Sequence, residues 1–305
     1  MSDRSVGKGR GNGKLILYGE HLVVYGEPAV VAALPRGVRA RASRAQGGAS
    51  ELVLDDGGVP EPDSPLARAF EAILDAFDDR LDGPVRVEME TEIPVGVGLG
   101  SSAATSAAIA RSLADLAGGG PIEAAVDRAE GVFHGSPSGI DRTAALDSGL
   151  HFYRPGDGDQ IGAVDGPPFR VGVVLAGEPA STSEMVASVR EFRARNGSLF
   201  EHLLQLVGDV ARSASDALSR GDRRRAGELM DVNHGALASL GVTTPALDEA
   251  CHVARAAGAL GAKLTGAGGG GCAVAMLPDG DHGVLDAWRR EGWEAFEATL
   301  GDGST

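Results

Sequence analysis

The spacing of apolar and polar residues divides the chain into short strands and longer helices. Apolar and polar residues alternate over 38–42, 51–54 and 85–93, which predicts strands with one buried face. Across residues 65–81 the apolar positions recur every three or four residues, which predicts an amphipathic helix. Further strands are predicted at 14–18, 22–25, 150–153, 169–175, 272–277 and 295–300, and further helices at 101–117, 122–133, 184–194, 198–218, 222–239 and 245–257.

Two segments lack this periodicity and shape the expected domain organisation. Residues 1–13 are polar and rich in glycine, and we expect them to form a mobile lead. Residues 156–168 are rich in glycine, aspartate and proline, so we expect a long loop or linker there. The pattern predicts an α+β fold in two domains, an N-terminal one over 1–165 and a C-terminal one over 166–305.

The net charge and the cysteine content exclude several kinds of partner and site. The chain carries 43 acidic and 28 basic residues, a formal charge of −15, so we expect neither nucleic acid nor an anionic membrane as a partner. No apolar run approaches the ~20 residues that a membrane span needs. The first residues do not resemble a signal peptide, and we expect a cytoplasmic protein. Two cysteines, Cys251 and Cys272, give no disulfide framework and no metal cluster.

Lysine is scarce in this sequence. Lys8, Lys14 and Lys263 are the only lysines among the 28 basic residues. A lysine within a motif is therefore a candidate for a chemical role, although coding bias alone also gives such a count.

One motif predicts a phosphate site. Residues 94–110, PVGVGLGSSAATSAAIA, lead from a strand through glycines into a helix. Glycines let backbone N–H groups approach an anion, and the helix N-terminus, capped by Ser101 or Ser102, adds donors and a favourable dipole. The alternative is a tight corner that needs small residues, and the three spaced glycines with two serines favour phosphate. The segment lacks the second strand and acidic residue that follow a dinucleotide-binding fingerprint, and the chain lacks the residue pattern of a Walker A loop.

A second glycine motif lies near the C-terminus. Residues 263–276, KLTGAGGGGCAVAM, place four consecutive glycines before an apolar strand. Such a tract between well-formed elements usually marks a close approach of the backbone to another group. We favour a loop that lines a ligand site, and the alternative is a flexible hairpin.

Two further segments contain candidate catalytic side chains. Residues 130–141, EGVFHGSPSGID, offer Glu130 and Asp141, of which one can hold a metal and the other take a proton. Residues 13–30, GKLILYGEHLVVYGEPAV, embed Lys14, Glu20 and His21 in apolar sequence. Taken alone, these residues are better explained as a solvated helix end, a turn and the charged face of an edge strand. Neither a GxSxG elbow nor an HExxH pair occurs.

In this order and spacing, the four segments resemble the GHMP small-molecule kinases, and most closely the mevalonate kinase group. The HGSPSGID and GEHLVVYG segments carry the likeness to that group, and residues 230–251 resemble the helical segment before its last motif. The resemblance implies two α+β domains with the active site in the cleft between them.

The resemblance also implies roles for individual residues. Asp141 matches the general base and Lys14 its neighbour, while Glu130 and Ser102 match the side chains that bind Mg²⁺. The residues that match the ATP-phosphate cradle are Pro94, Gly96, Gly98, Leu99, Gly100, Ser101, Ser102 and Ala103. The residues that match the substrate end are Glu20, His21, Gly266, Ala267 and, by a looser alignment, Thr182.

The expected activity is ATP- and Mg²⁺-dependent phosphorylation of the primary hydroxyl of mevalonate, a step of isoprenoid synthesis. Three alternatives stay open: a GHMP kinase for phosphomevalonate, homoserine or a sugar; a decarboxylase of the same fold; and a binding protein without activity. A binding protein is disfavoured by the presence of Lys14, Ser102, Glu130 and Asp141, because binding alone needs no base beside a metal site. The oligomeric state, a homodimer included, does not follow from the sequence.

Overall fold

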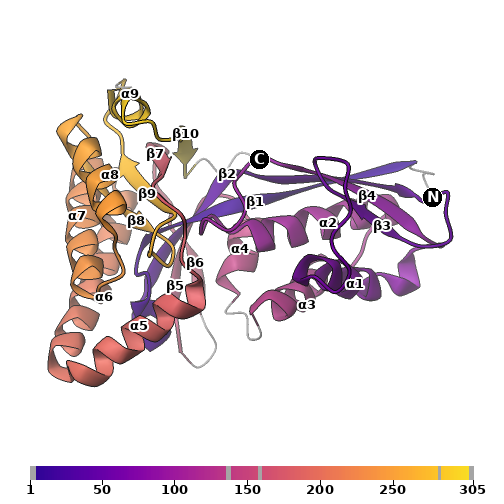
Figure 1. Ribbon diagram of the computed structural model, residues 1–305, viewed down its shortest axis with the longest axis horizontal. Coiled ribbons are helices and arrows are strands. Elements are labelled where there is room, and N and C mark those ends of the chain that lie inside the picture. The colour runs from indigo at the N-terminus through magenta and orange to yellow at the C-terminus, as the bar shows by residue number, and fades with distance from the viewer. Residues whose placement is uncertain (1–4, 135–138, 157–159, 281–282, 302–305) are drawn as a thin grey trace. The chain divides into compact units, whose positions relative to one another are not determined.

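The computed structural model describes residues 5–134, 139–156, 160–280 and 283–301 (Figure 1). The chain groups into two compact units. The first unit contains Met1–Lys14, Pro35–Val95 and Gly100–Asp147, and the second contains Leu15–Leu34, Gly96–Leu99 and Ser148–Thr305. Each unit combines β-sheet with helices packed beside it, which confirms the predicted α+β class. The predicted domain boundary after residue 165 stays a prediction.

Strands and helices alternate irregularly along the described chain. The strands are β1 (Val6–Tyr18), β2 (Ala29–Arg44), β3 (Glu51–Val53), β4 (Val85–Thr91), β5 (Leu150–Arg154), β6 (Gln160–Ala163), β7 (Phe169–Leu175), β8 (Gly261–Thr265), β9 (Cys272–Met276) and β10 (Ala295–Leu300). The helices are η1 (Leu22–Tyr25), α1 (Pro65–Ala76), η2 (Asp78–Arg80), α2 (Ser101–Ala117), α3 (Ile122–His134), α4 (Ile140–Leu146), α5 (Thr182–Arg195), α6 (Gly197–Ser219), α7 (Arg223–Ser239), α8 (Pro245–Ala256) and α9 (Gly283–Arg290). None of these helices has the length and apolar composition of a membrane span.

In the first unit, helices cover one face of a small sheet. β4 lies between β3, to which it is parallel, and residues 38–44 of β2, to which it is antiparallel. Helices α1 to α4 lie together on one side of these strands (Figure 1). Over residues 38–42 of β2, Val38, Ala40 and Ala42 are buried while Arg39 and Arg41 are exposed, which gives the predicted two-residue alternation.

The first part of β1 packs directly on the backbone of α2. A Cβ added at Gly11 would lie 1.9 Å from the carbonyl oxygen of Ala104, and one at Gly9 would lie 2.0 Å from that of Ala108. Alternate glycines therefore give β1 a smooth face, and the small residues of α2 allow the close approach. The predicted mobile lead at 1–13 is wrong from Val6 onward, because glycine composition suggested flexibility where spacing gives a packed strand.

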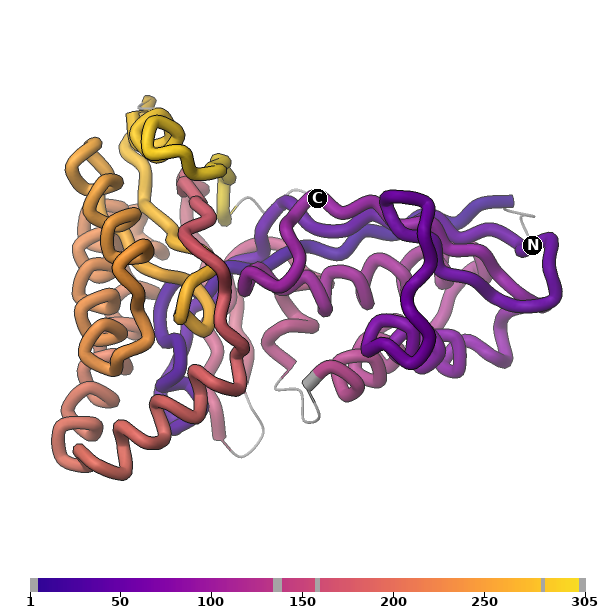
Figure 2. Tube along the Cα trace, in the orientation of Figure 1, coloured from indigo at the N-terminus to yellow at the C-terminus, as the bar shows by residue number. Residues whose placement is uncertain are grey.

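The second unit is built on a four-stranded sheet in the order β10-β7-β9-β8, with each neighbouring pair antiparallel. Helices α6 and α7 run side by side (Figure 2), and α7 and α8 pack against β8. The core of this unit contains Phe200, Leu247 and Trp288, whose indole N–H donates to the carbonyl of Ala250. In the same unit, residues 29–32 of β2 pair with β5, and β5 pairs with β6.

Several predicted elements differ from the structure for identifiable reasons. The apolar run 22–25 is not a strand but the short helix η1, which follows left-handed backbone at Gly19 and ends at Gly26, where φ is 104°. The predicted linker at 156–168 contains strand β6, and its residues 157–159 lie outside the described residues. The predicted helix 65–81 ends at Ala76, and η2 follows it. Helices α4 and α9 and strand β8 have no predicted counterpart.

Candidate active site

A lysine and an aspartate that lie 127 residues apart in the sequence form an ion pair in the first unit. The Nζ atom of Lys14, on β1, donates a hydrogen bond to Oδ1 of Asp141, in the first turn of α4. The side chains are 16% and 27% exposed, so both remain open to solvent. Asp141 is thus an ion-paired residue in the first turn of α4, not a free residue of a turn. The predicted turn before Asp141 falls at residues 135–138, which lie outside the described residues.

Side-chain contacts to the backbone hold Lys14 in this place. The Asn12 amide donates to the carbonyl of Asp147 at 2.9 Å, and Arg111 of α2 donates to the carbonyls of Arg10 and Leu146. These bonds fasten β1 to α2 and to the end of α4. A Cβ at Gly100 would lie only 2.9 Å from Cγ of Lys14, so the stem of the lysine lies directly against this glycine.

Glu130 of α3 belongs to the same cluster. Its side chain is buried, and burial together with the charge of Asp141 raises the pKa of this carboxyl to about 7. The charge of Lys14 and a hydrogen bond from the Ser102 side chain oppose the shift. The explanation of Glu130 as a solvated helix end is therefore wrong. Lys14, Ser102, Glu130 and Asp141 therefore form one electrostatically coupled group.

The glycine-rich part of the phosphate motif leads directly into the N-terminus of α2. Gly100 is the N-cap residue, with φ of 74°, and no side chain caps the helix, so the predicted capping by Ser101 or Ser102 is wrong. A glycine at this position leaves the space in front of the first helical turn open to an anion. Gly96 and Gly98 also have positive φ, of 82° and 87°, which favours glycine at both positions. Of the remaining residues of the predicted cradle, Leu99 and Ala103 are buried, and Pro94 lies in the turn after β4.

In the second unit, the two glycine motifs lie against each other. A Cβ at Gly266 would meet the Cα of Gly98 at 3.4 Å, and one at Gly271 would meet the carbonyl oxygen of Val97 at 3.0 Å. Residues 96–99 and 266–271 are thus in backbone contact, although sequence alone gave no reason to pair them.

The glycine tract after β8 is a packed loop. A Cβ at Gly268 would lie 2.1 Å from the carbonyl oxygen of Val242, and one at Gly270 would lie 1.9 Å from that of Glu178. The amide of Gly269 donates to Val242 at 2.8 Å. Since backbone contacts and hydrogen bonds fix the loop, the flexible-hairpin alternative is wrong.

His21 contacts this loop directly. Its Nε2 atom lies 2.7 Å from the carbonyl oxygen of Ala267, and the imidazole is mostly buried. Burial lowers the pKa of His21, so the ring is neutral at pH 7, donates through Nε2 and keeps Nδ1 as an acceptor. His21 has φ of 61°, an unusual conformation for a residue other than glycine.

Glu20 is buried rather than solvent-facing, contrary to the edge-strand explanation. It is 1% exposed, and its carboxylate accepts hydrogen bonds from Lys263 of β8 and from Asn233 of α7. Its predicted direct contact with substrate stays a prediction, as do the substrate roles of His21, Gly266 and Ala267. Thr182, the first residue of α5, is exposed and takes no part in the contacts described above, and its role also stays a prediction.

The motifs did not identify Asn233, and they gave Lys263 no partner. One signal was available for Asn233. Helix α7 buries residues 226, 227, 229, 230, 233, 234, 236 and 237, so the helical period places Asn233 on a face that is apolar apart from His234. A buried amide on such a face requires hydrogen-bond partners, and Glu20 and Gly19 supply them.

Comparisons with known proteins agree with this geometry. The chain matches the GHMP kinases N terminal domain over residues 65–149, which include Ser102, Glu130 and Asp141. It matches the GHMP kinases C terminal domain over 214–294, which include Asn233 and Lys263. Among curated relatives, the mevalonate kinase of Pyrococcus abyssi is 34% identical, with 90% of this chain and 89% of that one covered. The mevalonate kinase of Aeropyrum pernix is 31% identical, covering 98% and 97%.

Solved structures give the same picture. The crystal structure of L. major mevalonate kinase in complex with R-mevalonate superimposes with a TM-score of 0.88 at 28% identity, covering 99% of this chain and 98% of that one. The Methanococcus jannaschii mevalonate kinase has the same fold, with a TM-score of 0.82 at 22% identity and coverage of 98% and 99%.

Proposed function

Since the chain belongs to the mevalonate kinase family, within the GHMP kinases, we propose that it phosphorylates the primary hydroxyl of mevalonate with ATP, giving 5-phosphomevalonate and ADP. The observation that carries the proposal is the Lys14–Asp141 ion pair, held beside Gly100 at the start of α2. It places a proton acceptor and a positive charge next to a helix N-terminus suited to phosphate.

Phosphoryl transfer requires positioning and charge neutralisation more than covalent chemistry. Asp141 would accept the proton of the attacking hydroxyl, since its carboxylate is partly exposed. Lys14 would stabilise the negative charge that grows on the hydroxyl oxygen as the proton leaves. The backbone of residues 96–100 and the first turn of α2 would hold the phosphates of ATP.

The residues around Glu130 fit a magnesium ion. In the described ranges no group of three His, Cys, Asp or Glu side chains is arranged to hold a metal. Mg²⁺ suits a site with few protein ligands, because it is usually bound by one or two carboxylates together with phosphate oxygens and water. Glu130 and the Ser102 hydroxyl, which are in hydrogen-bond contact, supply hard oxygen donors of that kind. When bound, Mg²⁺ would neutralise negative charge on the phosphates.

Replacement of Glu130 tests the magnesium site. Glu130→Ala should raise the free Mg²⁺ needed for half-maximal rate by about tenfold or more, as expected for loss of one of few protein ligands. Glu123→Gln is the matched control, since Glu123 is an exposed carboxylate near the start of the same helix. A magnesium titration of Glu130→Ala that matches the control would remove Glu130 from the site.

At the acceptor end, we assign His21 and the 266–267 peptide to substrate binding. The neutral ring of His21 keeps Nδ1 available to accept a hydrogen bond, and Ala267 lies at the other side of the same ring. Mevalonate presents two hydroxyl groups and a carboxylate, so an acceptor of this kind suits a hydroxyl donor.

The deciding experiment is release of ADP with ATP, Mg²⁺ and a panel of acceptors: mevalonate, phosphomevalonate, homoserine and galactose. We expect kcat/KM to be highest for mevalonate by at least about a hundredfold, which corresponds to ~2.7 kcal/mol of transition-state discrimination. Higher turnover of another acceptor would keep the phosphotransferase chemistry and discard the substrate. Binding of ATP without turnover of any acceptor would favour the binding-protein alternative.

A further inference from the structure

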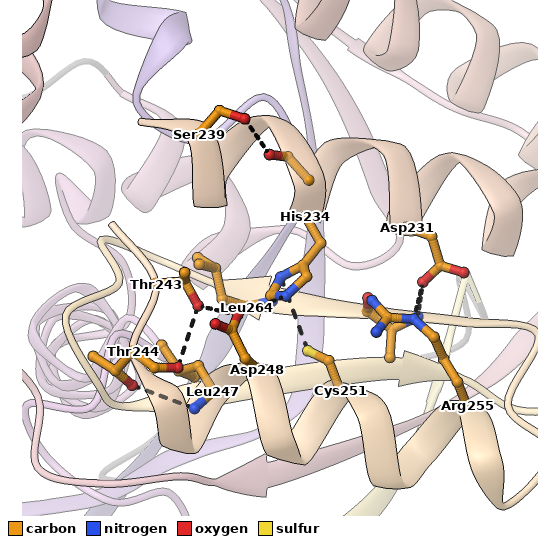
Figure 3. Close-up of polar contacts among 12 residues, drawn as sticks. Asp231, His234, Ser239, Thr243, Thr244, Leu247, Asp248, Cys251, Arg255 and Leu264 are labelled. Atoms are coloured by element: carbon orange, nitrogen blue, oxygen red, sulfur yellow. Dashed lines mark hydrogen bonds and ion pairs between the residues drawn. The ribbon is translucent and has the colours of Figure 1, made fainter. Parts of the chain in front are cut away.

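The outer edge of strand β8 is hydrogen-bonded by side chains instead of by another strand. β8 is the last strand of its sheet, and its free edge carries the backbone groups of Ala262 and Leu264. The amide of Ala262 donates to Asp231 of α7 at 2.9 Å, and its carbonyl accepts from Arg255 of α8 at 2.8 Å. Figure 3 shows α7 and α8 contributing these side chains from neighbouring positions. An edge covered in this way cannot pair with another strand.

The backbone groups of Leu264, which is nearer to the glycine loop, are also hydrogen-bonded by side chains. The amide of Leu264 donates to Nδ1 of His234 at 3.4 Å (Figure 3), and its carbonyl accepts from Nζ of Lys263 at 2.5 Å. The Lys263 ammonium is fully buried and also forms the ion pair with Glu20. The start of the loop at Gly266 is therefore fastened to α7 on one side and to Glu20 on the other.

Asn233 completes this arrangement from α7. It is fully buried, its Oδ1 accepts the amide of Gly19 at 3.4 Å, and its Nδ2 donates to Oε2 of Glu20 at 3.1 Å. One amide side chain therefore fixes both the backbone before Glu20 and the carboxylate of Glu20. The other carboxylate oxygen is held by Lys263, so the segment 19–21 and the end of β8 share a single buried network.

The segment that Asn233 holds has an unfavourable backbone conformation. Gly19 has φ of 97°, and His21 has φ of 61° and ψ of −44°. A conformation of this kind persists only where the surrounding structure determines it. Around residues 19–21 those determinants include the two hydrogen bonds of Asn233, the Lys263–Glu20 pair and the contact of His21 with Ala267.

We propose that Asn233 is a positioning residue of the acceptor site: it sets His21 and the loop at Gly266–Ala267 in their binding arrangement before the acceptor arrives. The inference rests on the proposed function, because it takes His21 and Ala267 as the acceptor end. Asn233 itself contacts neither acceptor nor nucleotide in this assignment. Asn233 lowers the entropic cost of ordering His21 and the loop at Gly266–Ala267, and this preorganisation strengthens binding of the acceptor.

The test compares two substitutions on the same helix. In Asn233→Ala the KM for mevalonate should rise about tenfold while the KM for ATP changes by less than about twofold, since acceptor-side groups alone lose their positioning. Asp231→Ala is the control. It removes partly buried hydrogen bonds from α7 to Ala262 of β8 and to Arg255 of α8, at the end of β8 distant from the loop. It should lower Tm and leave both KM values within about twofold of the wild type.

A binding measurement separates positioning from a loss of folded protein. Saturating mevalonate should raise the Tm of the wild type and of Asp231→Ala, and should raise that of Asn233→Ala far less at the same concentration. The Tm increase given by ATP should be the same in all three. Asn233→Ser, which keeps an oxygen acceptor near Gly19 but loses the donor to Glu20, supplies the same comparison if the alanine variant does not fold.

The outcomes for this inference and for the proposed function are distinct. If the wild type prefers another acceptor, the proposed function fails, and the KM and Tm comparisons are made with that acceptor. If Asn233→Ala shows equal changes in the KM values for acceptor and ATP, or none beyond those of Asp231→Ala, the positioning role is overturned.

Discussion

At the scale of single residues, exposure separates two arrangements that resemble catalytic groups. Cys251 Sγ lies 3.9 Å from Nδ1 of His234, whose Nε2 lies 3.1 Å from Oδ1 of Asp248 (Figure 3). A thiol, imidazole and carboxylate in series suggest a nucleophile. However, Cys251 is fully buried, and burial raises the pKa of its thiol to about 12. The Lys14–Asp141 pair, by contrast, is open to solvent.

Substitution of Asp141 tests its assignment as the base. Asp141→Asn should lower kcat by about 10²–10⁴-fold, because an amide cannot accept the hydroxyl proton. Equilibrium binding of ATP should change little. Asp75→Asn, at an exposed position on α1, is the control and should keep the wild-type rate. Substantial turnover by Asp141→Asn would show that proton transfer does not depend on this carboxylate.

Sequence predicted the open side chains of the site better than the buried ones. Asp141 and Lys14 lie in distinctive motifs, so the resemblance to a known family was sufficient to pair them as candidates. The contacts of Glu20 with Asn233 and with Lys263 join residues that are 213 and 243 positions apart in the sequence. Charged residues in apolar sequence are usually solvated, so burial of this pair became evident only with the tertiary contacts.

At the scale of elements, helices were predicted more accurately than glycine-rich strands. α7 and α8 agree with prediction because an N-cap side chain begins each, Asp222 and Thr244, and an apolar stripe continues it. The first part of β1, before the predicted strand at 14–18, was missed because glycine has no side chain to reveal alternation. η1 was mistaken for a strand because four apolar residues are too few to show a helical period.

The packing of β1 on α2 predicts the effect of one methyl group. Gly11→Ala should destabilise the protein by about 3 kcal/mol, since the new Cβ has no room beside backbone atoms of Ala104 that cannot rotate away. Gly47→Ala, where an added Cβ meets nothing within 4 Å, should change stability by less than about 0.5 kcal/mol. Chemical denaturation of both variants measures the difference, and equal midpoints would show that β1 does not need this close approach.

The connection between α7 and β8 predicts a response to acid. Burial, Arg255 and Lys263 lower the pKa of His234, while Asp248 opposes them. The folded protein therefore binds fewer protons than the unfolded chain below the ordinary pKa of about 6.5, and stability falls as pH decreases from that value. Protonation also places a hydrogen on Nδ1, which then cannot accept the amide of Leu264.

Comparison with a variant that lacks His234 isolates this effect. His234→Asn should be less stable than the wild type at pH 7.5, and the difference should narrow as pH falls toward 5, because asparagine does not titrate. Unfolding midpoints across this range measure it. His21 is also buried, but it is present in both proteins, so its contribution to the pH dependence cancels in the difference between their stabilities. A constant difference across the range would show that His234 does not contribute to the acid response.

At the scale of the whole molecule, net charge dominates the long-range electrostatics. With 43 acidic and 28 basic residues, repulsion among carboxylates opposes compaction. Surface ion pairs offset little of this repulsion. Arg220 and Asp216, for example, form a pair whose side chains are 72% and 58% exposed.

Added salt should therefore stabilise the protein. Raising NaCl from about 0.01 M to about 0.3 M shortens the Debye length from ~30 Å to less than 10 Å, so repulsion is screened and Tm should rise by several degrees. KCl should give the same rise, since screening does not depend on the identity of the ion. A fall in Tm would mean that attractive pairs outweigh the net charge.

The glycine face of β1 also determines how much sequence variation the start of the chain tolerates. Replacements at Gly7, Gly9 and Gly11 push into the α2 backbone, whereas Val6 and Lys8 point outward and are exposed. In a library of all single substitutions, tolerance along this segment would alternate with a period of two residues, as in a buried strand. A stretch whose composition suggests a dispensable linker would then be among the least permissive in the chain.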